Sequence, residues 1–261
     1  MCSKTRITLF VNHHMIRQTL FRILGFRNYL FFISRVFLRT YLWKLYLSDH
    51  EQVRFLGKLV KPNDVCIDIG ANLGYFAIPL SHWVGSEGKV LAVEPVQLFR
   101  EVLRRNVDRM GLGNIEVLPY ALGDVDGQTV YLGTPEVAGV VRHGRTEILD
   151  GRMTDEVAFR HKAEMRRPDT LFGHLDRLNY IKCDVEGYEL HIVPHLLEIM
   201  SRFKPILEIE VAELTHKKAI IGWVQPLGYQ VMYLENGQLR PFQLENPTHH
   251  HHIELYFLPN P

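Results

Sequence analysis

The 261-residue chain predicts an α/β fold built around a largely parallel sheet. From Asp64 onward, short apolar runs alternate with segments of helical periodicity, which is typical of consecutive βα units. An apolar content of 46% and a charged content of 23% are ordinary for a globular protein and argue against extensive disorder. The apolar runs that we expect to form strands are 65–69, 89–94, 115–122, 180–185, 205–211, 229–234 and 253–258.

Helices are expected between these strands. Residues 95–111 place their apolar side chains on one stripe of a helix, with Pro95 in the first turn and Gly111 just past the end. A similar pattern predicts a helix from about 189 to 202, and a third from 75 to 83 directly after the first strand.

Residues 125–167 interrupt the βα rhythm. Within them, 128–133 and 138–141 could form extra strands, whereas 150–167 is polar and weakly helical in pattern. We interpret the whole segment as an insertion between the third and fourth strands, on the side where ligands enter. It is expected to shape the pocket for a substrate.

The first 48 residues differ in charge from the rest. They contain eight Lys and Arg residues and no Asp or Glu, and the longest run free of Lys and Arg, Ile7–Ile16, is ten residues long. That run is shorter than the ~20 residues needed to span a bilayer, and no secretory signal is expected. Residues 1–48 are therefore expected to form a helical extension before a domain at 49–261.

Two roles remain open for this extension. It could lie as a basic amphipathic segment on an anionic membrane, or cover an acidic substrate. Alternatively its helices dock on the domain with their arginines in solvent, which we favour because aromatic residues occur on every side. Cys66 and Cys183 lie in apolar runs, so we expect buried thiols and a cytoplasmic location, with contact to the inner membrane face as the alternative.

The stretch 64-DVCIDIGANLGYFAIPL-80 predicts a ligand pocket after the first strand. Gly70 permits a tight turn and close backbone approach, and Gly74 lets the following helix begin against a ligand. Asn72 offers both a donor and an acceptor. Asp68 is placed to accept a hydrogen bond from a bound amino or hydroxyl group.

The spacing of this loop indicates which nucleotide-like cofactor it suits. A dinucleotide fingerprint needs G-x-G-x-x-G, but this loop is G-x-x-x-G with Asn72 at the middle glycine, which leaves less room for a diphosphate. Glu94 ends the second strand and could bind both ribose hydroxyls. Asp124, after the third strand, could accept from an adenine amino group. Each acid could instead be a turn residue or a helix cap.

These motifs resemble the FkbM-type S-adenosylmethionine-dependent methyltransferases. The resemblance implies a class I methyltransferase (Rossmann-like) fold, a seven-stranded, mostly parallel sheet with helices on both faces and an antiparallel last strand. It also implies S-adenosylmethionine as cofactor and a hydroxyl group of a natural product or glycan as acceptor. The segments that carry it are 66-CIDIGANLGYFAI-78, 93-VEP-95, 121-ALGD-124, 170-TLFGHLDRLNYIKCDVEGYEL-190 and 207-LEIEV-211. The cofactor-binding residues expected from the loop and the resemblance are Asp68, Gly70, Asn72, Gly74, Tyr75, Glu94, Ala121 and Asp124.

The transfer chemistry points to a second set of residues. Methyl transfer needs the acceptor oxygen, the methyl carbon and the sulfur in line, and a base can add ~10²–10⁴-fold. Asp184 and Glu186 follow the fourth strand, and Glu210 lies near the carboxyl end of the fifth. These three carboxylates are the candidate catalytic residues.

Several roles stay open for these carboxylates. They could deprotonate the acceptor, bind the methionine amino group, or ligate Mg²⁺, although a metal is not favoured. Asp184 and Glu186 could instead cap the helix that follows. His143, His174 and His191 are further candidate bases.

The expected activity is therefore O-methylation of a small-molecule or glycan hydroxyl. The alternative is an NAD-dependent oxidoreductase or epimerase on a similar fold, against which the missing central glycine counts. A nucleic-acid partner is not expected, because the sequence has neither an N-P-P-[YF] motif nor a Lys/Arg-rich run.

Overall fold

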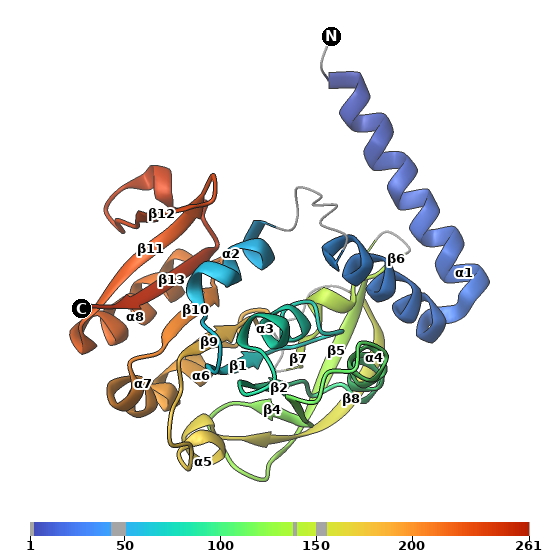
Figure 1. Ribbon diagram of the computed structural model, residues 1–261. Helices are drawn as coiled ribbons and strands as arrows, with labels where there is room; N and C mark the ends of the chain where they lie inside the picture. The colour runs from blue at the N-terminus through green and yellow to red at the C-terminus, as the bar shows by residue number, and fades with distance from the viewer. Residues whose placement is uncertain (1–2, 43–50, 138–139, 150–155, 261) are drawn as a thin grey trace.

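A large mixed sheet forms the centre of the computed structural model, which describes residues 3–42, 51–137, 140–149 and 156–260 (Figure 1). The helices are α1 Ser3–Leu42, α2 Glu51–Leu59, α3 Ala77–Val84, α4 Gln97–Arg109, α5 Pro168–Phe172, α6 Glu189–Ile192, α7 Leu197–Phe203 and α8 Leu214–Val224. The strands are β1 Val65–Ile69, β2 Lys89–Val93, β3 Ile115–Leu118, β4 Tyr120–Leu122, β5 Thr129–Val137, β6 Val140–Val141, β7 Glu147–Ile148, β8 Glu156–Arg166, β9 Tyr180–Cys183, β10 Ile206–Glu210, β11 Tyr229–Glu235, β12 Gln238–Pro241 and β13 Glu254–Pro259.

The strand order of the large sheet is β12-β11-β13-β10-β9-β1-β2-β3. The pairs among β3, β2, β1, β9 and β10 are parallel, and β13 runs antiparallel to both of its neighbours. The expected seven-stranded class I methyltransferase topology is thus present, with the last strand antiparallel as expected. The short strand β12 extends it to eight through a hairpin with β11.

The centre of the sheet is buried on both faces, which explains why strands such as β1 and β9 are nearly continuous apolar runs. Every residue of β1 is buried. Ile67 and Ile69 belong to the hydrophobic cluster on one face, and Cys66 belongs to the cluster on the other face. Strand order reverses at β1, between β2 and β9, so a ligand site is expected at the carboxyl ends of these strands.

Two of the expected elements are different in the structure. The run 115–122 is not one strand, because Pro119 separates β3 in the large sheet from β4, which pairs with β8 in a second sheet. Proline has no backbone N–H and cannot continue a ladder. The predicted helix at about 189–202 is broken into α6, a 3₁₀ turn that contains Pro194, and α7.

The weakly helical pattern of residues 150–167 also predicts the wrong secondary structure. Residues 156–166 form strand β8, and 150–155 lie outside the described residues. One face of β8 carries alternate residues that pack inward, among them Ala163 and Met165, which are buried in the core of the second sheet. This alternation of inward and outward residues is typical of a strand. The many charged residues between the inward positions make it hard to recognise in the sequence.

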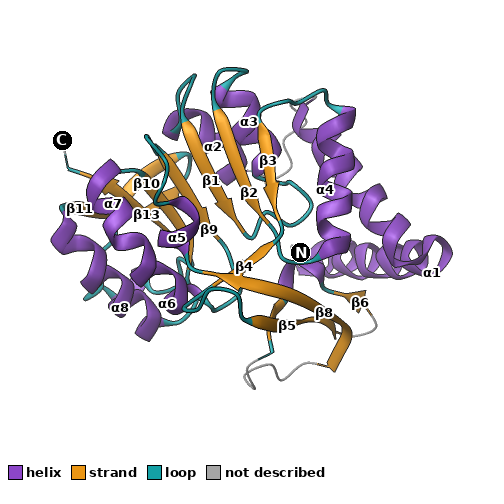
Figure 2. Cartoon of the chain, turned by 90° about the horizontal axis from the view of Figure 1, so that it is seen from below, coloured by secondary structure: helices purple, strands orange, loops and turns teal. Residues whose placement is uncertain are grey.

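The second sheet, with strand order β4-β8-β5-β6, crosses the end of the large sheet toward which β1 and β2 point (Figure 2). The extra strand expected at 128–133 is the longer β5, 129–137. The strand expected at 138–141 is reduced to β6 at 140–141, since 138–139 lie outside the described residues. The insertion therefore stands where a ligand would enter.

The expected N-terminal helical extension is α1, which bends at Gly25 (φ 70°, ψ 161°). The half before Gly25 projects from the body, whereas the half after it runs beside α4 and β6 (Figure 1). No helix among the described residues is long and apolar enough to cross a membrane.

The half of α1 after Gly25 is built into the core next to the loop that follows β1. Tyr29 and Leu30 are buried in a cluster with Leu73 of that loop and with side chains of α4. The buried Asn106 of α4 donates hydrogen bonds to Ser34 Oγ at 3.1 Å and to the carbonyl of Leu73 at 3.2 Å. This half of α1 thus packs against the loop after β1 and stabilises it.

Candidate active site

A cavity of about 200 Å³ opens at the carboxyl ends of β1, β2 and β9. It is lined by the loop after β1, the ends of β2, β4 and β9, and the turn 143–148 of the insertion. A single water needs only ~10–15 Å³ by the same measure. The cavity therefore has room for a sizeable small molecule, and it lies where strand order reverses.

The loop after β1 takes backbone conformations that its residues alone explain. Gly70 and Gly74 have φ of 85° and 94°, and Asn72 has φ of 50°. Glycine adopts this left-handed region freely, and asparagine enters it more readily than most residues. A Cβ at Gly70 would lie 1.9 Å from the carbonyl oxygen of Asp184, so the loop packs directly on the chain after β9.

Gly74 serves packing rather than the cavity. A Cβ there would lie 2.5 Å from Leu103 Cδ1, and Gly74 is outside the cavity lining. Its absent side chain lets the loop approach α4. Tyr75, the next residue, does line the cavity, and its ring centroid lies 4.5 Å from that of Phe37 of α1.

Asp68 presents an unsatisfied acceptor to the cavity. The side chain is 1% exposed, and burial raises the pKa of its carboxyl to about 7. Among the residues that the structure describes, Asp68 Oδ2 has no hydrogen-bond partner. A buried carboxylate oxygen of this kind is satisfied by a ligand that brings N–H or O–H donors.

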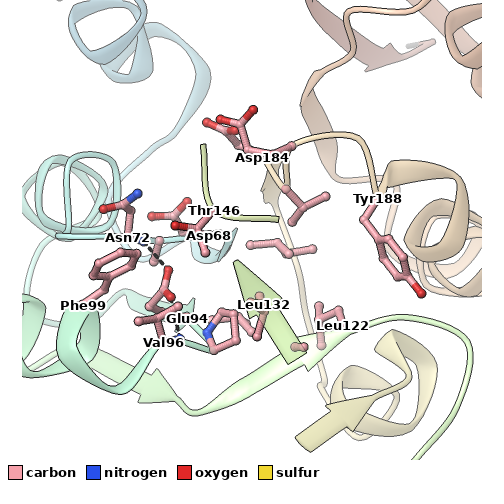
Figure 3. Close-up of a pocket in the computed structure, with 18 of the residues that line it drawn as sticks. Asp68, Asn72, Glu94, Val96, Phe99, Leu122, Leu132, Thr146, Asp184 and Tyr188 are labelled. Carbon is pink, nitrogen blue, oxygen red and sulfur yellow. Dashed lines mark hydrogen bonds between the residues drawn. The ribbon is translucent and has the colours of Figure 1, made fainter. Parts of the chain in front are cut away.

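Glu94 ties the end of β2 to the loop (Figure 3). Its Oε2 accepts from the backbone N–H of Asn72 at 2.8 Å, and its Oε1 accepts from that of Val96 at 2.7 Å. Burial raises the pKa of Glu94 to about 7 despite these two bonds. Each carboxylate oxygen can accept a second bond, so Glu94 can still receive a pair of ribose hydroxyls.

The insertion closes over this half of the cavity. Asn72 Nδ2 donates to the backbone carbonyl of His143 at 3.2 Å, while Asn72 Oδ1 lacks a partner within the described part of the chain. The His143 ring centroid lies 6.1 Å from that of Phe99 and 6.3 Å from that of Tyr75. Burial lowers the pKa of His143 to about 4, so its ring is neutral at neutral pH.

Two of the three candidate catalytic carboxylates line the cavity. Asp184 and Glu186 both do so, and Asp184 lies above Asp68 in Figure 3. Burial and the neighbouring charge of Asp184 raise the pKa of Glu186 to about 8. Glu210 lies outside the lining, opposite Glu254 of β13, and burial raises its pKa to about 7.

Neither Asp184 nor Glu186 is the N-cap residue of the helix that follows. Helix α6 begins at Glu189, and its N-cap residue, Tyr188, makes no side-chain capping bond. The carboxylate of Glu189 itself accepts from the Gly187 N–H at 2.8 Å.

Only some of the remaining candidate site residues line the cavity. Ala121 lines the cavity, but Asp124 does not. The Asp124 carboxylate is half exposed and bonds His191 Nδ1 at 2.6 Å and His195 Nε2 at 3.2 Å. His174, like His191, is outside the lining, so His143 is the histidine of the three that borders the cavity.

Sequence reasoning missed Lys182, a buried lysine on β9 whose side chain also lines the cavity. Its signal was a lysine inside the apolar run 180-YIKCDV-185, where a buried charge needs partners. In the described part of the chain, no three His, Cys, Asp or Glu side chains gather so as to hold a metal ion.

The residues present fit S-adenosylmethionine. Orphaned acceptors on Asp68 and Asn72 suit a ligand with an ammonium group and hydroxyls, and Glu94 retains acceptor capacity for a ribose. Apolar and aromatic side chains, among them Val96, Phe99 and Leu122, line the cavity beside these polar groups and suit an adenine ring (Figure 3).

Known proteins resemble this chain in sequence and in structure. Over 170 residues it is 25% identical to the AMB antimetabolite synthetase AmbE of Pseudomonas aeruginosa, a match that covers 52% of this chain and 8% of that protein. The methyltransferase FkbM from Methylobacillus flagellatus KT aligns with a TM-score of 0.49 and 18% identity, over 76% of this chain and 44% of that one. A SAM-dependent O-methyltransferase from Thermotoga maritima aligns with a TM-score of 0.42 and 15% identity, over 81% and 66%.

The family of the chain follows from a match to the sequence pattern of a protein family. The methyltransferase FkbM domain matches residues 68–257, which include the loop after β1, the end of β2 and the acidic segment after β9. An NAD-dependent oxidoreductase or epimerase, the alternative that the sequence left open, is therefore set aside. The chain belongs to the FkbM family of methyltransferases.

Proposed function

We propose that the protein methylates a hydroxyl group of a sugar, a glycan or another small natural product. The observation that carries this proposal is that Asp184 and Glu186 share one cavity with the cofactor loop. A hydroxyl is a weak nucleophile until its proton is taken, and carboxylates in a partly buried site can take it.

The roles of the residues follow from the needs of the reaction. S-adenosylmethionine, when bound, supplies a methyl group on a positively charged sulfur. Asp68, Asn72 and Glu94 hold the donor in a fixed place, which supplies the orientation that an in-line displacement needs. Asp184, or Glu186 above its pKa of about 8, accepts the hydroxyl proton as the acceptor oxygen gains the methyl group and S-adenosylhomocysteine leaves.

The lining of the cavity supports a neutral acceptor. Its acidic wall, with Asp184 and Glu186, would repel a phosphate or carboxylate, but it can accept hydrogen bonds from hydroxyl groups. The insertion adds apolar side chains, Leu132 and Ile148, opposite that wall. The similarity to an antimetabolite synthetase is in keeping with a small natural product as acceptor.

The proposal is tested by incubating the protein with S-adenosylmethionine labelled in its methyl group and a panel of sugars, glycans and polyketides. We expect a labelled ether in at least one product, identified by mass and fragmentation. Asp184→Asn should lower kcat by ~10²–10⁴, while Asp108→Asn, on the exposed face of α4, should not. Label found only on nitrogen or carbon would refute O-methylation.

A further inference from the structure

A row of buried polar side chains crosses the large sheet beneath the cavity. The strand register sets Lys182 of β9 between Asp68 of β1 and Glu208 of β10, and sets Glu208 opposite Tyr256 of β13. All four side chains are at most 2% exposed. Because alternate residues of a strand share a face, Asp184 follows Lys182 on this same face, one step closer to the cavity.

Lys182 is the cation within this group of acids. Its Nζ lies 3.4 Å from Asp184 Oδ2, 3.9 Å from Glu208 Oε1 and 4.2 Å from the ring centroid of Phe76. Burial alone would favour the neutral amine, but the neighbouring carboxylates, first Asp184 and then Glu208, raise the pKa of Lys182 above its ordinary value. The side chain therefore remains an ammonium.

Glu208 also faces this ammonium, at a longer distance. Its Oε2 accepts a hydrogen bond from the Tyr180 hydroxyl, whereas its Oε1, 3.9 Å from Lys182 Nζ, has no hydrogen-bond partner among the described residues. Asp184 is the nearer carboxylate, is 29% exposed and faces the cavity. The ion pair of Lys182 with Asp184 is thus shorter than its pair with Glu208, and it connects the buried side chains of the sheet to a residue that lines the cavity.

We propose that Lys182 is a positioning residue that holds the Asp184 carboxylate against the cavity wall where the positively charged methyl donor binds. The inference rests on the assignment of S-adenosylmethionine as donor and not on the nature of the acceptor. A buried ion pair of this kind fixes geometry even when its net contribution to stability is small.

Several acids surround Asp184 and decide what loss of the ammonium would do. They are Asp68 on β1, Glu208 and Glu210 on β10, Glu254 on β13, and Glu186 and Glu189 beyond β9, while Arg145 of the insertion is a cation that acts on Glu186. Without Lys182, Asp184 would lose the cation at 3.4 Å that fixes its carboxylate, and the neighbouring acids would repel it from that place.

The test is a double-mutant cycle on donor binding by calorimetry. Lys182→Met should weaken binding of S-adenosylmethionine about tenfold near neutral pH. The same substitution in an Asp184→Asn background should change the affinity little. A purely structural role for Lys182 predicts an equal loss in both backgrounds, and that result would overturn the proposal.

Two controls keep the test decisive. Glu208→Gln removes the other acid beside the ammonium and keeps the acceptor for Tyr180, so it should leave the donor affinity within about twofold of the parent. If Lys182→Met does not fold, the donor affinity of the Asp184→Asn variant alone is measured. An affinity equal to that of the parent protein would then contradict the proposal. Failure to methylate any hydroxyl, with the cycle as expected, would refute only the proposed function.

Discussion

Asp68 shows how one residue can couple the charge of the site to its ligand. Its raised pKa, about 7, has burial as the first cause, with Lys182 opposing the shift and Asp184 adding to it. An ammonium group that bonds the free Oδ2 would favour the ionised form and lower this pKa. Binding of the donor should therefore release a proton near neutral pH.

This coupling gives the first prediction. The affinity for S-adenosylmethionine should rise from about pH 6 to about pH 8, and calorimetry in buffers of different ionisation enthalpy should record the proton release. Asp68→Asn should lower the affinity at pH 8 by about tenfold or more and flatten its dependence on pH. An affinity that is independent of pH in the parent protein would contradict the assignment of Asp68 to the donor.

Gly70 gives the second prediction. Its φ of 85° and the 1.9 Å approach of a Cβ to the Asp184 carbonyl oxygen mean that alanine cannot fit without moving the chain after β9. Gly70→Ala should cost at least ~1–3 kcal/mol of unfolding free energy and abolish donor binding. Gly113→Ala is the matched control, because a Cβ there meets nothing within 4 Å. Equal melting temperatures and affinities for the two variants would refute this account of the loop.

At the residue scale, the sequence predicted the conformation of the loop after β1 better than the surroundings of the acidic side of the cavity. The loop conformation and the position of Glu94 were predictable from the sequence because backbone conformation and strand ends depend on nearby residues. The positions of Lys182 and of the turn at His143 beside the cavity were not predictable in this way. They depend on strand pairing and on an insertion that folds over the cavity. Asp124 was placed near the cavity by its position after a strand, but two histidines of a later helical segment hold it outside.

Helix α1 is an element whose sequence suggested a surface but whose second half is core. Leu30 is fully buried against the cluster that includes Leu73 of the cofactor loop, while Val36 on the same helix is 47% exposed. The third prediction is that Leu30→Ala costs ~2–5 kcal/mol of unfolding free energy and also weakens donor binding. Val36→Ala should change neither by a measurable amount, as judged by chemical denaturation and calorimetry.

Truncation tests the two halves of α1 separately. Deletion of residues 1–48 should lower both the melting temperature and the donor affinity, because it uncovers Phe99 and removes the Ser34 partner of Asn106. Deletion of residues 1–16 leaves these contacts in place and should alter neither property. A fully active protein that lacks residues 1–48 would show that α1 does not support the loop.

The central strands of the large sheet, β1, β2, β9 and β10, were predictable because they are buried almost throughout and form nearly continuous apolar runs. The second sheet was harder to predict. Strand β8 alternates inward apolar residues with outward charged residues. Because charged residues are common in exposed helices, the local pattern predicts a weak helix instead. Its partner strands β4 and β5 lie far from it in sequence, and this pairing decides its conformation.

The whole molecule should show the raised pKa values of its site in its stability. Asp68, Glu94 and Glu210 have pKa values raised to about 7, and that of Glu186 is raised to about 8, chiefly by burial. The folded protein therefore holds protons that the unfolded chain has lost, so the stability from these groups is fully present below their unfolded pKa and falls as pH rises through 7 to 8. His143, with its pKa lowered to about 4, acts in the opposite sense, but only below its unfolded value of about 6.5.

The fourth prediction follows from this sign. Between about pH 7 and about pH 8.5, where His143 is mostly neutral in both states, the melting temperature of the cofactor-free protein should fall, and the fall should level off above the folded pKa values of the carboxyls. Saturating S-adenosylhomocysteine should reduce the slope if its donors satisfy Asp68 and Glu94. A melting temperature that rises through this range would show that these carboxyls are ionised in the folded protein.

The most direct test of the account is a crystal structure of the protein with S-adenosylhomocysteine. We expect the ligand in the cavity at the carboxyl ends of β1, β2 and β9, with its ribose hydroxyls on Glu94 and its amino group beside Asp68. A ligand bound elsewhere, or one that leaves both carboxylates without contact, would contradict the central claim.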